Sequence, residues 1–267
     1  VDLWNIFNEF NNGDSWQLYD RKTNCLIAHA KAAALIRAHS QAPVSTAHAM
    51  TPYFPANPDD EFDIARTRIT NWVVNDFFYH AVRTGEILFP YRDAVEVPEL
   101  KGSCDFWAIN YYTRHFVTAR NASGTAPRYE CHRIRPIKND FYLEEFYPQA
   151  LVDGLCRLKD LPVYITENGF CCDDDRLRIL YLGRHLQALN EAIQRGCDIR
   201  GYLYWSLMDN FEWWSFVPRF GMVGVDFKTF ERTPKPSAYL YREIIERNGL
   251  DRELILKYLP EFRDWKI

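Results

Sequence analysis

Five short apolar segments that alternate with longer helical patterns constrain the fold of this chain more than any other feature of its sequence. Each segment has the length, and most have the β-branched or aromatic content, that is typical of a strand. They are Leu3 to Phe7, Val44 to Ala49, Cys104 to Tyr112, Val163 to Thr166 and Gly201 to Trp205. Because a helical pattern follows each strand, the sequence favours an α/β fold with a parallel sheet covered by helices.

The connecting segments carry the signals of helix starts and ends. Proline is favoured at the first helical position, Asp and Ser cap helix starts, and Gly ends helices. The predicted helices run from about Thr23 to Ala38, from Asp59-Asp60 to Val82 before Gly85, from Pro148 to Lys159, from Asp173–Asp175 to Gly196, and from Pro236 to Gly249. No linker or shift in composition interrupts the alternation, so residues 1–267 are predicted to form a single domain. The basic stretch from Ala122 to Asn139 is expected to be a surface loop.

Composition and charge narrow the class of protein. The chain has 267 residues, 47% of them hydrophobic and 25% charged, with a formal net charge of −4. A slightly acidic chain gives no electrostatic reason to expect nucleic acid or an anionic membrane as a partner. No apolar run is long enough to span a bilayer. Because Val1 is not a natural start, we expect further sequence upstream of it.

The seven cysteines are odd in number and scattered, without the spacing of a metal site or of a closed disulfide framework. Reduced thiols in a cytoplasmic protein are the simplest interpretation. The adjacent Cys171-Cys172 pair leaves a redox or metal feature open as an alternative.

Polar or aromatic residues follow four of the five predicted strands. They are Asn8-Glu9, Asn110-Tyr111-Tyr112, Glu167-Asn168 and the segment from Trp205 onward. The active sites of β/α proteins are assembled where the carboxyl ends of parallel strands meet. Glu167 is therefore expected at the rim of the sheet rather than in its core.

Two of these residues are carboxylic acids, Glu9 and Glu167, and each has an Asn neighbour. A pair of carboxyl groups is the minimum apparatus for glycoside hydrolysis, and in retaining enzymes the two stand about 5–5.5 Å apart. The alternative is two unrelated surface glutamates that cap helices. The segment Tyr204 to Trp213 favours a sugar site, because its two Trp and two acids offer stacking faces and hydroxyl acceptors.

The segments FNE, INYYT, YITENG and YWSLMDNFEW, in this order, closely resemble the family-one β-glycosidases, which include the β-glucosidases. The similarity continues through RFGMVGVDF and RTPKPSAYLYREII. The resemblance implies a (β/α)₈ TIM barrel and a retaining exo-β-glycosidase acting on β-glucosides or β-galactosides through a covalent glycosyl-enzyme intermediate. It implies neither a metal nor an organic cofactor.

The resemblance also implies a role for each matching residue. Glu167 would be the nucleophile and Glu9 the general acid/base. Asn8 would contact the sugar 2-hydroxyl, while Asn110 and Tyr112 would orient Glu167. Trp205 would form a stacking platform, Glu212 and Trp213 would bind the remote hydroxyls, and Phe220 would close the pocket. A carboxylate at Glu212 would repel a phosphate dianion, which favours a non-phosphorylated substrate.

Two departures from the family pattern bear on function. Phe10 stands where the family has proline, so Glu9 is expected to be displaced. The Asn-Glu segment also closes strand four in the family, so only strands four to eight are expected here, with two sheet edges left open. An N-terminal partner segment or self-association would complete the barrel. The alternatives are a non-catalytic carbohydrate- or protein-binding remnant and, less economically, a β/α barrel of another activity.

Overall fold

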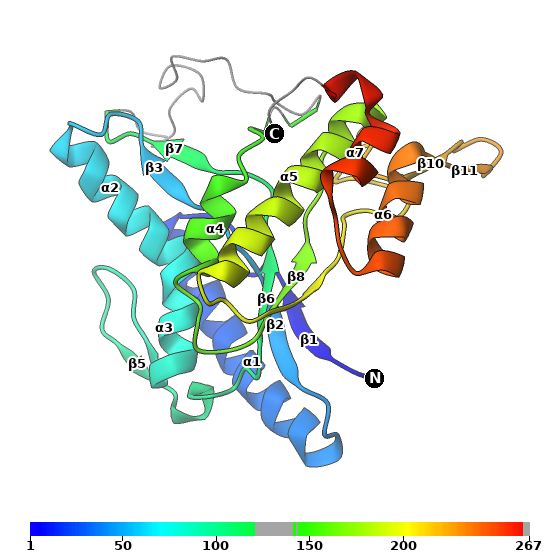
Figure 1. Ribbon diagram of the computed structural model, residues 1–267. Helices are drawn as coiled ribbons and strands as arrows, with labels where there is room; N and C mark the ends of the chain where they lie inside the picture. The colour runs from blue at the N-terminus through cyan, green and yellow to red at the C-terminus, as the bar shows by residue number, and fades with distance from the viewer. Residues whose placement is uncertain (121–140, 143, 264–267) are drawn as a thin grey trace.

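The main sheet of the protein is parallel, as the sequence predicts. The computed structural model describes residues 1–120, 141–142 and 144–263, so the predicted loop from Ala122 to Asn139 lies outside the described residues. The sheet contains β1 (Trp4–Asn8), β2 (Val44–Ala49), β6 (Trp107–Asn110), β8 (Val163–Glu167) and β9 (Ile199–Tyr202) (Figure 1). Their order is β1-β2-β6-β8-β9, and every neighbouring pair is parallel. All five predicted strands are therefore present.

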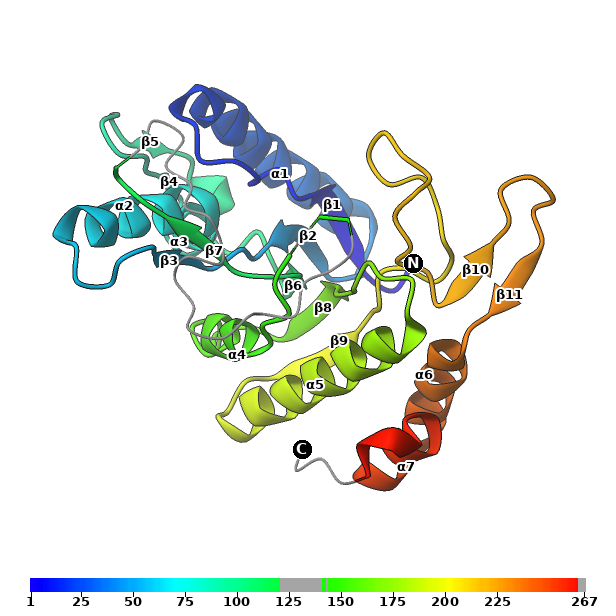
Figure 2. The ribbon, with the colours of Figure 1, turned by 90° about the horizontal axis from the view of Figure 1, so that it is seen from above.

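Helices cover the outside of the curved sheet, as Figure 2 shows from above. They are α1 (Tyr19–His39), α2 (Glu61–Asn71), α3 (Phe77–Thr84), α4 (Gln149–Leu155), α5 (Asp175–Gln194), α6 (Pro236–Arg247) and α7 (Arg252–Tyr258). Short 3₁₀ turns lie at Trp16–Leu18, Pro98–Leu100 and Pro260–Phe262. None of the described helices combines the length and apolar composition needed to cross a bilayer.

Some predicted boundaries need correction. The single helix predicted up to Val82 is two helices, α2 and α3, joined by a π-helical turn at Trp72–Asp76. The last strand starts at Ile199, not Gly201. Gly201 therefore lies inside the strand. A side chain is excluded at this position, because a Cβ there would stand 2.6 Å from the Tyr164 ring of β8. Strand β6 covers only the middle of the predicted Cys104 to Tyr112 segment.

Three small strand pairs and α7 were not predicted. β3 (Tyr53–Pro55) pairs in parallel with β7 (His115–Val117). β4 (Glu86–Ile87) and β5 (Val95–Glu96), and β10 (Val223–Val225) and β11 (Arg232–Pro234), form antiparallel pairs. Strands of two or three residues are too short to give a clear periodicity in the sequence.

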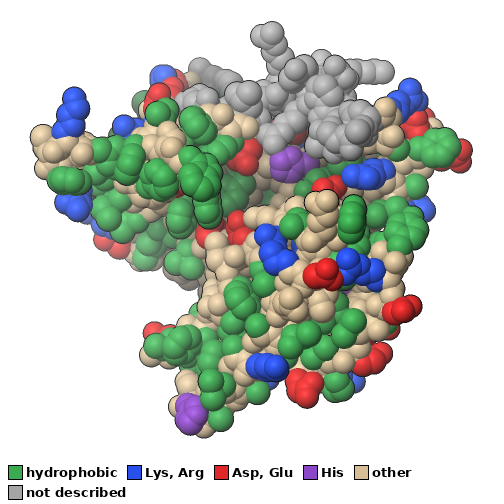
Figure 3. All heavy atoms as spheres, turned by 180° about the vertical axis from the view of Figure 1, so that it is seen from behind, with side chains coloured by type: hydrophobic (Ala, Val, Ile, Leu, Met, Phe, Trp, Pro, Cys, Tyr) green, Lys and Arg blue, Asp and Glu red, His purple; other side chains and the backbone are tan. Residues whose placement is uncertain are grey.

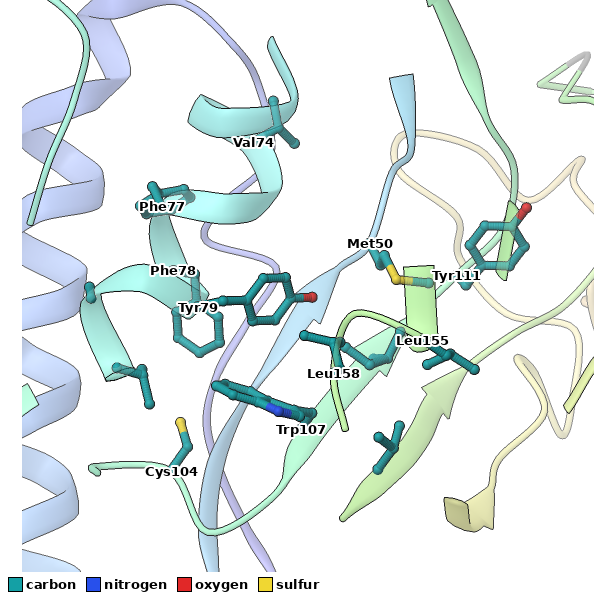
Figure 4. Packing of buried hydrophobic residues seen from close by; sticks show 14 of the residues in the cluster. Met50, Val74, Phe77, Phe78, Tyr79, Cys104, Trp107, Tyr111, Leu155 and Leu158 are labelled. Carbon is teal, nitrogen blue, oxygen red and sulfur yellow. The ribbon is translucent and has the colours of Figure 1, made fainter. Parts of the chain in front are cut away.

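The largest hydrophobic cluster lies between the sheet and its helices. Phe78 and Tyr79 of α3 lie beside Trp107 of β6 (Figure 4), and the rings of Tyr79 and Trp107 meet edge to face at 5.1 Å. A second cluster joins α5, α6 and α7. The opposite face of the sheet carries a small cluster that includes Ala47, Ala108 and Tyr164. The packed layer behind the strands therefore fixes the positions of their carboxyl ends.

Candidate active site

The carboxyl ends of the strands surround one pocket with a volume of about 280 Å³. All nine residues predicted from the sequence to form the site line this pocket. They are Asn8, Glu9, Asn110, Tyr112, Glu167, Trp205, Glu212, Trp213 and Phe220. A larger hollow of about 630 Å³ lies between α5 and the segment that leads into α4, and no residue of the main sheet lines it. The convergence of polar groups at the strand ends therefore decides which pocket is the candidate site.

Glu9 leaves the end of β1 in a left-handed conformation, with φ of 52°. Its backbone N–H donates to the carbonyl of Ala47 at 2.8 Å. The next residue, Phe10, is buried, and its ring lies 5.8–6.0 Å from those of Phe7, Phe77 and Phe78. In this chain a buried aromatic anchor, rather than a proline, thus shapes the turn that presents Glu9, and Glu9 still faces the pocket.

Two amides hold the carboxylate of Glu9. Asn110 Nδ2 donates to Glu9 Oε1 at 2.9 Å, and Asn12 Nδ2 donates to Glu9 Oε2 at 2.9 Å. Asn110 Nδ2 also lies 3.0 Å from Asn8 Oδ1. Its own Oδ1 accepts a hydrogen bond of 2.6 Å from the Thr166 hydroxyl. An ionised Glu9 can only accept, so it selects the end of the Asn110 amide that carries the N–H groups.

Glu167 is the last residue of β8 and is half-buried. The Tyr112 hydroxyl donates to Glu167 Oε2 at 2.7 Å. Burial raises the pKa of Tyr112 well above its usual value, so this phenol keeps its proton and acts as a donor. This hydrogen bond is consistent with the expectation that Tyr112 orients Glu167.

The pKa of the Glu167 carboxyl is raised to about 7, chiefly by burial and to a smaller extent by the negative charges of Glu9 and Glu212. Hydrogen bonds from Tyr112 and Asn110 act in the opposite direction. No cation is among these groups. Near neutral pH a large fraction of Glu167 is consequently protonated in this chain.

The loop after β9 supplies the other side of the pocket. The Trp205 indole N–H donates to Glu212 Oε1 at 2.9 Å, and burial raises the pKa of the Glu212 carboxyl. Trp205 lies directly against the loop after β8, since a Cβ on Gly169 would stand 1.7 Å from the Trp205 carbonyl oxygen. Phe220 is buried, whereas Trp213 lines the pocket but remains 74% exposed.

Comparison with known proteins decides the family. The sequence model of glycosyl hydrolase family 1 matches residues 6–250. The chain belongs to glycosyl hydrolase family 1. Family 1 relatives of known structure are TIM-barrel glycosidases, and the parallel sheet of this chain matches part of that barrel.

Three relatives show how far the similarity extends. A β-galactosidase of Sulfolobus acidocaldarius is 37% identical over 246 residues, a match that covers 87% of this chain and 49% of that protein. A 6-phospho-β-galactosidase of Staphylococcus haemolyticus is 28% identical, covering 92% of this chain and 67% of that protein. The structure of a Thermotoga maritima β-glucosidase in complex with deoxynojirimycin superposes with a TM-score of 0.81 at 27% identity, covering 94% of this chain and 65% of that chain. This family 1 member thus spans about half the length of the archaeal β-galactosidases that it matches.

Sequence reasoning missed several residues that line the family 1 pocket. They are Asn12, Ala49, Met50, Thr51, Thr113, His115, Tyr142 and Glu144. Met50 and Thr51 follow β2, the one predicted strand that no predicted site residue follows, although Thr51 is polar. Asn12 stands three residues after Glu9, a spacing that a turn brings back to the carboxylate. Tyr142 and Glu144 come from an irregular segment that has no periodic signal.

Proposed function

We propose that this family 1 member acts, within a complete barrel, as a retaining exo-β-glycosidase on non-phosphorylated β-glucosides or β-galactosides. One observation carries the proposal. Glu9 and Glu167 come from strands at different positions in the sheet and line the same pocket, where Asn110 and Tyr112 hold them by hydrogen bonds. Two carboxyl groups around one small pocket are the apparatus that glycoside hydrolysis requires.

In the proposed mechanism Glu167 attacks the anomeric carbon as Glu9 protonates the departing glycosidic oxygen. The leaving alcohol departs and a glycosyl-Glu167 ester remains. Glu9, now ionised, then removes a proton from water, which cleaves the ester and restores both carboxyl groups. The amides of Asn110 and Asn12 support Glu9 when it carries the negative charge.

The substrate class follows from the loop after β9. Trp205 offers an indole face for the sugar ring, and its N–H holds Glu212 in the pocket wall. Glu212 can accept hydrogen bonds from sugar hydroxyls. A phosphate at this end of the sugar would meet a buried carboxylate, so we propose a neutral sugar, in contrast to the 6-phospho substrate in the name of the staphylococcal relative.

The raised pKa of Glu167 indicates what this role requires beyond the described residues. A nucleophilic carboxylate must be ionised, yet the charges that reach Glu167 are those of Glu9 and Glu212. A nearby cation would lower its pKa. We therefore propose that further β/α units, from an N-terminal segment, a partner chain or a second copy, supply that cation and pair with the edges of β1 and β9 that no described strand occupies.

Covalent trapping tests the proposal. The chain is prepared alone and together with any segment or partner chain found to complete the barrel, and each preparation is treated with a 2-deoxy-2-fluoro-glycoside that carries a good leaving group. We expect stoichiometric labelling of Glu167 in the completed protein, with release of one leaving group per label. The Glu167→Gln variant should remain unlabelled, while Glu231→Gln, a change on the exposed loop between β10 and β11, should label normally. A label on another carboxyl group refutes the assignment.

A second candidate is a non-catalytic carbohydrate-binding module. The raised pKa of Glu167 and the sheet edges that stay unpaired within the described residues favour it. It predicts that sugars bind in the pocket, quenching Trp fluorescence, while the completed protein shows neither labelling nor turnover. For the location we propose a cytoplasmic protein, which the free thiols of Cys25, Cys104, Cys156 and Cys197 support.

A further inference from the structure

Two cysteines lie together at the end of the sheet opposite the pocket. Cys156 caps the C-terminus of α4, and Cys197 lies between α5 and the start of β9. Their sulfur atoms are 3.8 Å apart. Both are free thiols in this structure. The sulfur atoms are thus at contact distance, and a disulfide needs them to approach to about 2.05 Å.

The backbone holds both residues in place. The N–H of Cys156 donates to the Val152 carbonyl, and the N–H of Cys197 donates to the Ala192 carbonyl, each at 3.0 Å. Lys159 Nζ also donates to the Arg195 carbonyl, which joins the same two segments by a second contact. These backbone contacts therefore hold the two sulfur atoms close together where the end of α4 packs against the α5–β9 turn.

The two thiols differ in their access to solvent. Cys156 is half-buried, whereas Cys197 is only 4% exposed. Burial raises the pKa of the Cys197 thiol to about 11, and the neighbouring Cys156 contributes in the same direction. Cys156 is consequently the sulfur that a reagent reaches first, and Cys197 is placed to react only with Cys156.

We propose that Cys156 and Cys197 form a thiol modification site, which a low-molecular-weight disulfide of the glutathione type converts to an internal disulfide. The Cys156 thiolate attacks one sulfur of the reagent, forming a mixed disulfide and releasing one glutathione thiolate, which takes up a proton. The Cys197 sulfur, having lost its proton, attacks the Cys156 sulfur and releases the second glutathione. Two protein thiols are oxidised by two electrons, and one glutathione disulfide is reduced to two glutathione molecules.

The bond would act on the exposed edge of the sheet. It joins residues 41 positions apart and encloses β8 and α5 in a covalent loop. Because β9 is paired on one side only within the described residues, tying its start to the α4–β8 junction restrains one of the two edge strands of the sheet. Loop closure of this size stabilises mainly by restricting the unfolded chain. The pocket lies at the other end of the strands and stays open.

The test uses the full chain, reduced and then equilibrated with graded ratios of oxidised to reduced glutathione. Remaining thiols are blocked by alkylation, and non-reducing peptide mapping by mass spectrometry locates any disulfide. We expect one cross-linked peptide that joins Cys156 to Cys197 and a Tm higher by about 5 °C or more, reversed by dithiothreitol. The Cys197→Ser variant should instead stop at one glutathione adduct on Cys156, and Cys156→Ser should leave Cys197 unmodified.

Cys25→Ser is the matched control, because it removes a half-buried thiol from α1, which contains neither Cys156 nor Cys197. This variant should still form the disulfide and show the same rise in Tm on oxidation. The proposal is overturned if both thiols are still alkylated after oxidation, if either pairs with another cysteine, or if the bond forms without a rise in Tm. None of these readouts depends on glycosidase activity.

Discussion

The centre of the sheet and its two edges are built differently. Every residue of β2 and β6 is buried, and the helices pack behind them. At the edges Trp4 of β1 is 38% exposed and Leu203, which follows β9, is 56% exposed. Within the described residues β1 pairs only with β2, and β9 only with β8. The core behind the sheet is therefore complete, whereas the sheet itself is open along its sides.

The two carboxyl groups of the site also differ in this way, since one comes from the centre of the sheet and the other from its edge. Glu167 stands on β8, between two neighbouring strands, whereas Glu9 follows the edge strand β1. The loop after β9 exposes Phe211, Trp213, Trp214 and Phe216. Figure 3 shows the molecule from behind, with hydrophobic side chains gathered over part of the surface that faces the viewer. Exposed apolar surface beside a free strand edge is typical of an interface, which is why further β/α units are expected there.

The largest expected effect compares the central carboxyl group with the edge carboxyl group. In the completed enzyme Glu167→Gln should lower kcat by about 10⁴-fold or more for every substrate, because no covalent intermediate can form. Glu9→Gln should lower kcat by about 10²–10⁴-fold for poor leaving groups and spare activated aryl glycosides. Steady-state kinetics over a series of leaving groups checks this. Equal losses for all leaving groups in Glu9→Gln would remove Glu9 from the acid role.

Substitutions at the centre of the sheet should lower the free energy of unfolding more than substitutions at its edge. Ile109 of β6 is fully buried, so Ile109→Ala should cost about 2–5 kcal/mol of unfolding free energy. Leu203→Ala at the open side is the matched control and should change it by about 0.5 kcal/mol or less. Urea unfolding measures both. Comparable losses would show that β9 is covered in solution.

The pH dependence of stability tests the setting of Glu167. Its pKa is about 7 in the folded chain, above the ordinary value of 4.5. Between these pH values the unfolded chain loses a proton that the folded chain keeps, so stability falls as pH rises through this window. Glu167→Gln should therefore raise the Tm by a few degrees at pH 8 and have little effect at pH 4.

A flat difference between Glu167→Gln and the parent across that range would show that the folded carboxyl group is not destabilised by burial. Differential scanning fluorimetry at each pH is sufficient. Repeating the series on the completed protein sharpens the comparison, since a cation beside Glu167 should lower its pKa and abolish the gain from the substitution.

The smallest expected effect concerns the edges themselves. A charge on an open edge discourages pairing with other chains. Trp4→Lys and Leu203→Lys should change stability by about 0.5 kcal/mol or less, yet reduce self-association and dye binding of the isolated chain several-fold. Sedimentation velocity and dye fluorescence give the two readouts. A compact monomer that binds no dye even before substitution would contradict an open sheet.

The sequence predicted the parts of the fold that depend on local periodicity. The alternation of strands and helices is confirmed, and most of the residues named after the strands meet in one pocket, whereas Tyr111 and Asn168 are buried behind it. Features set by contacts between distant segments were not predictable. One example is the π-helical turn at Trp72–Asp76. Others are the packing of Gly201 against the Tyr164 ring and the hydrogen bond from Asn12 to Glu9. The pKa of Glu167 belongs to the same group, because it depends on burial and on charges from other strands.

The side-chain amide of Asn110 has a consequence for how a single substitution would spread through the site. It donates to Glu9 and also lowers the pKa of Glu167, so one amide serves both carboxyl groups. Removing this amide would withdraw a hydrogen bond from both acids in one step. The geometry of the two carboxyl groups therefore depends on one side chain of the central strand β6.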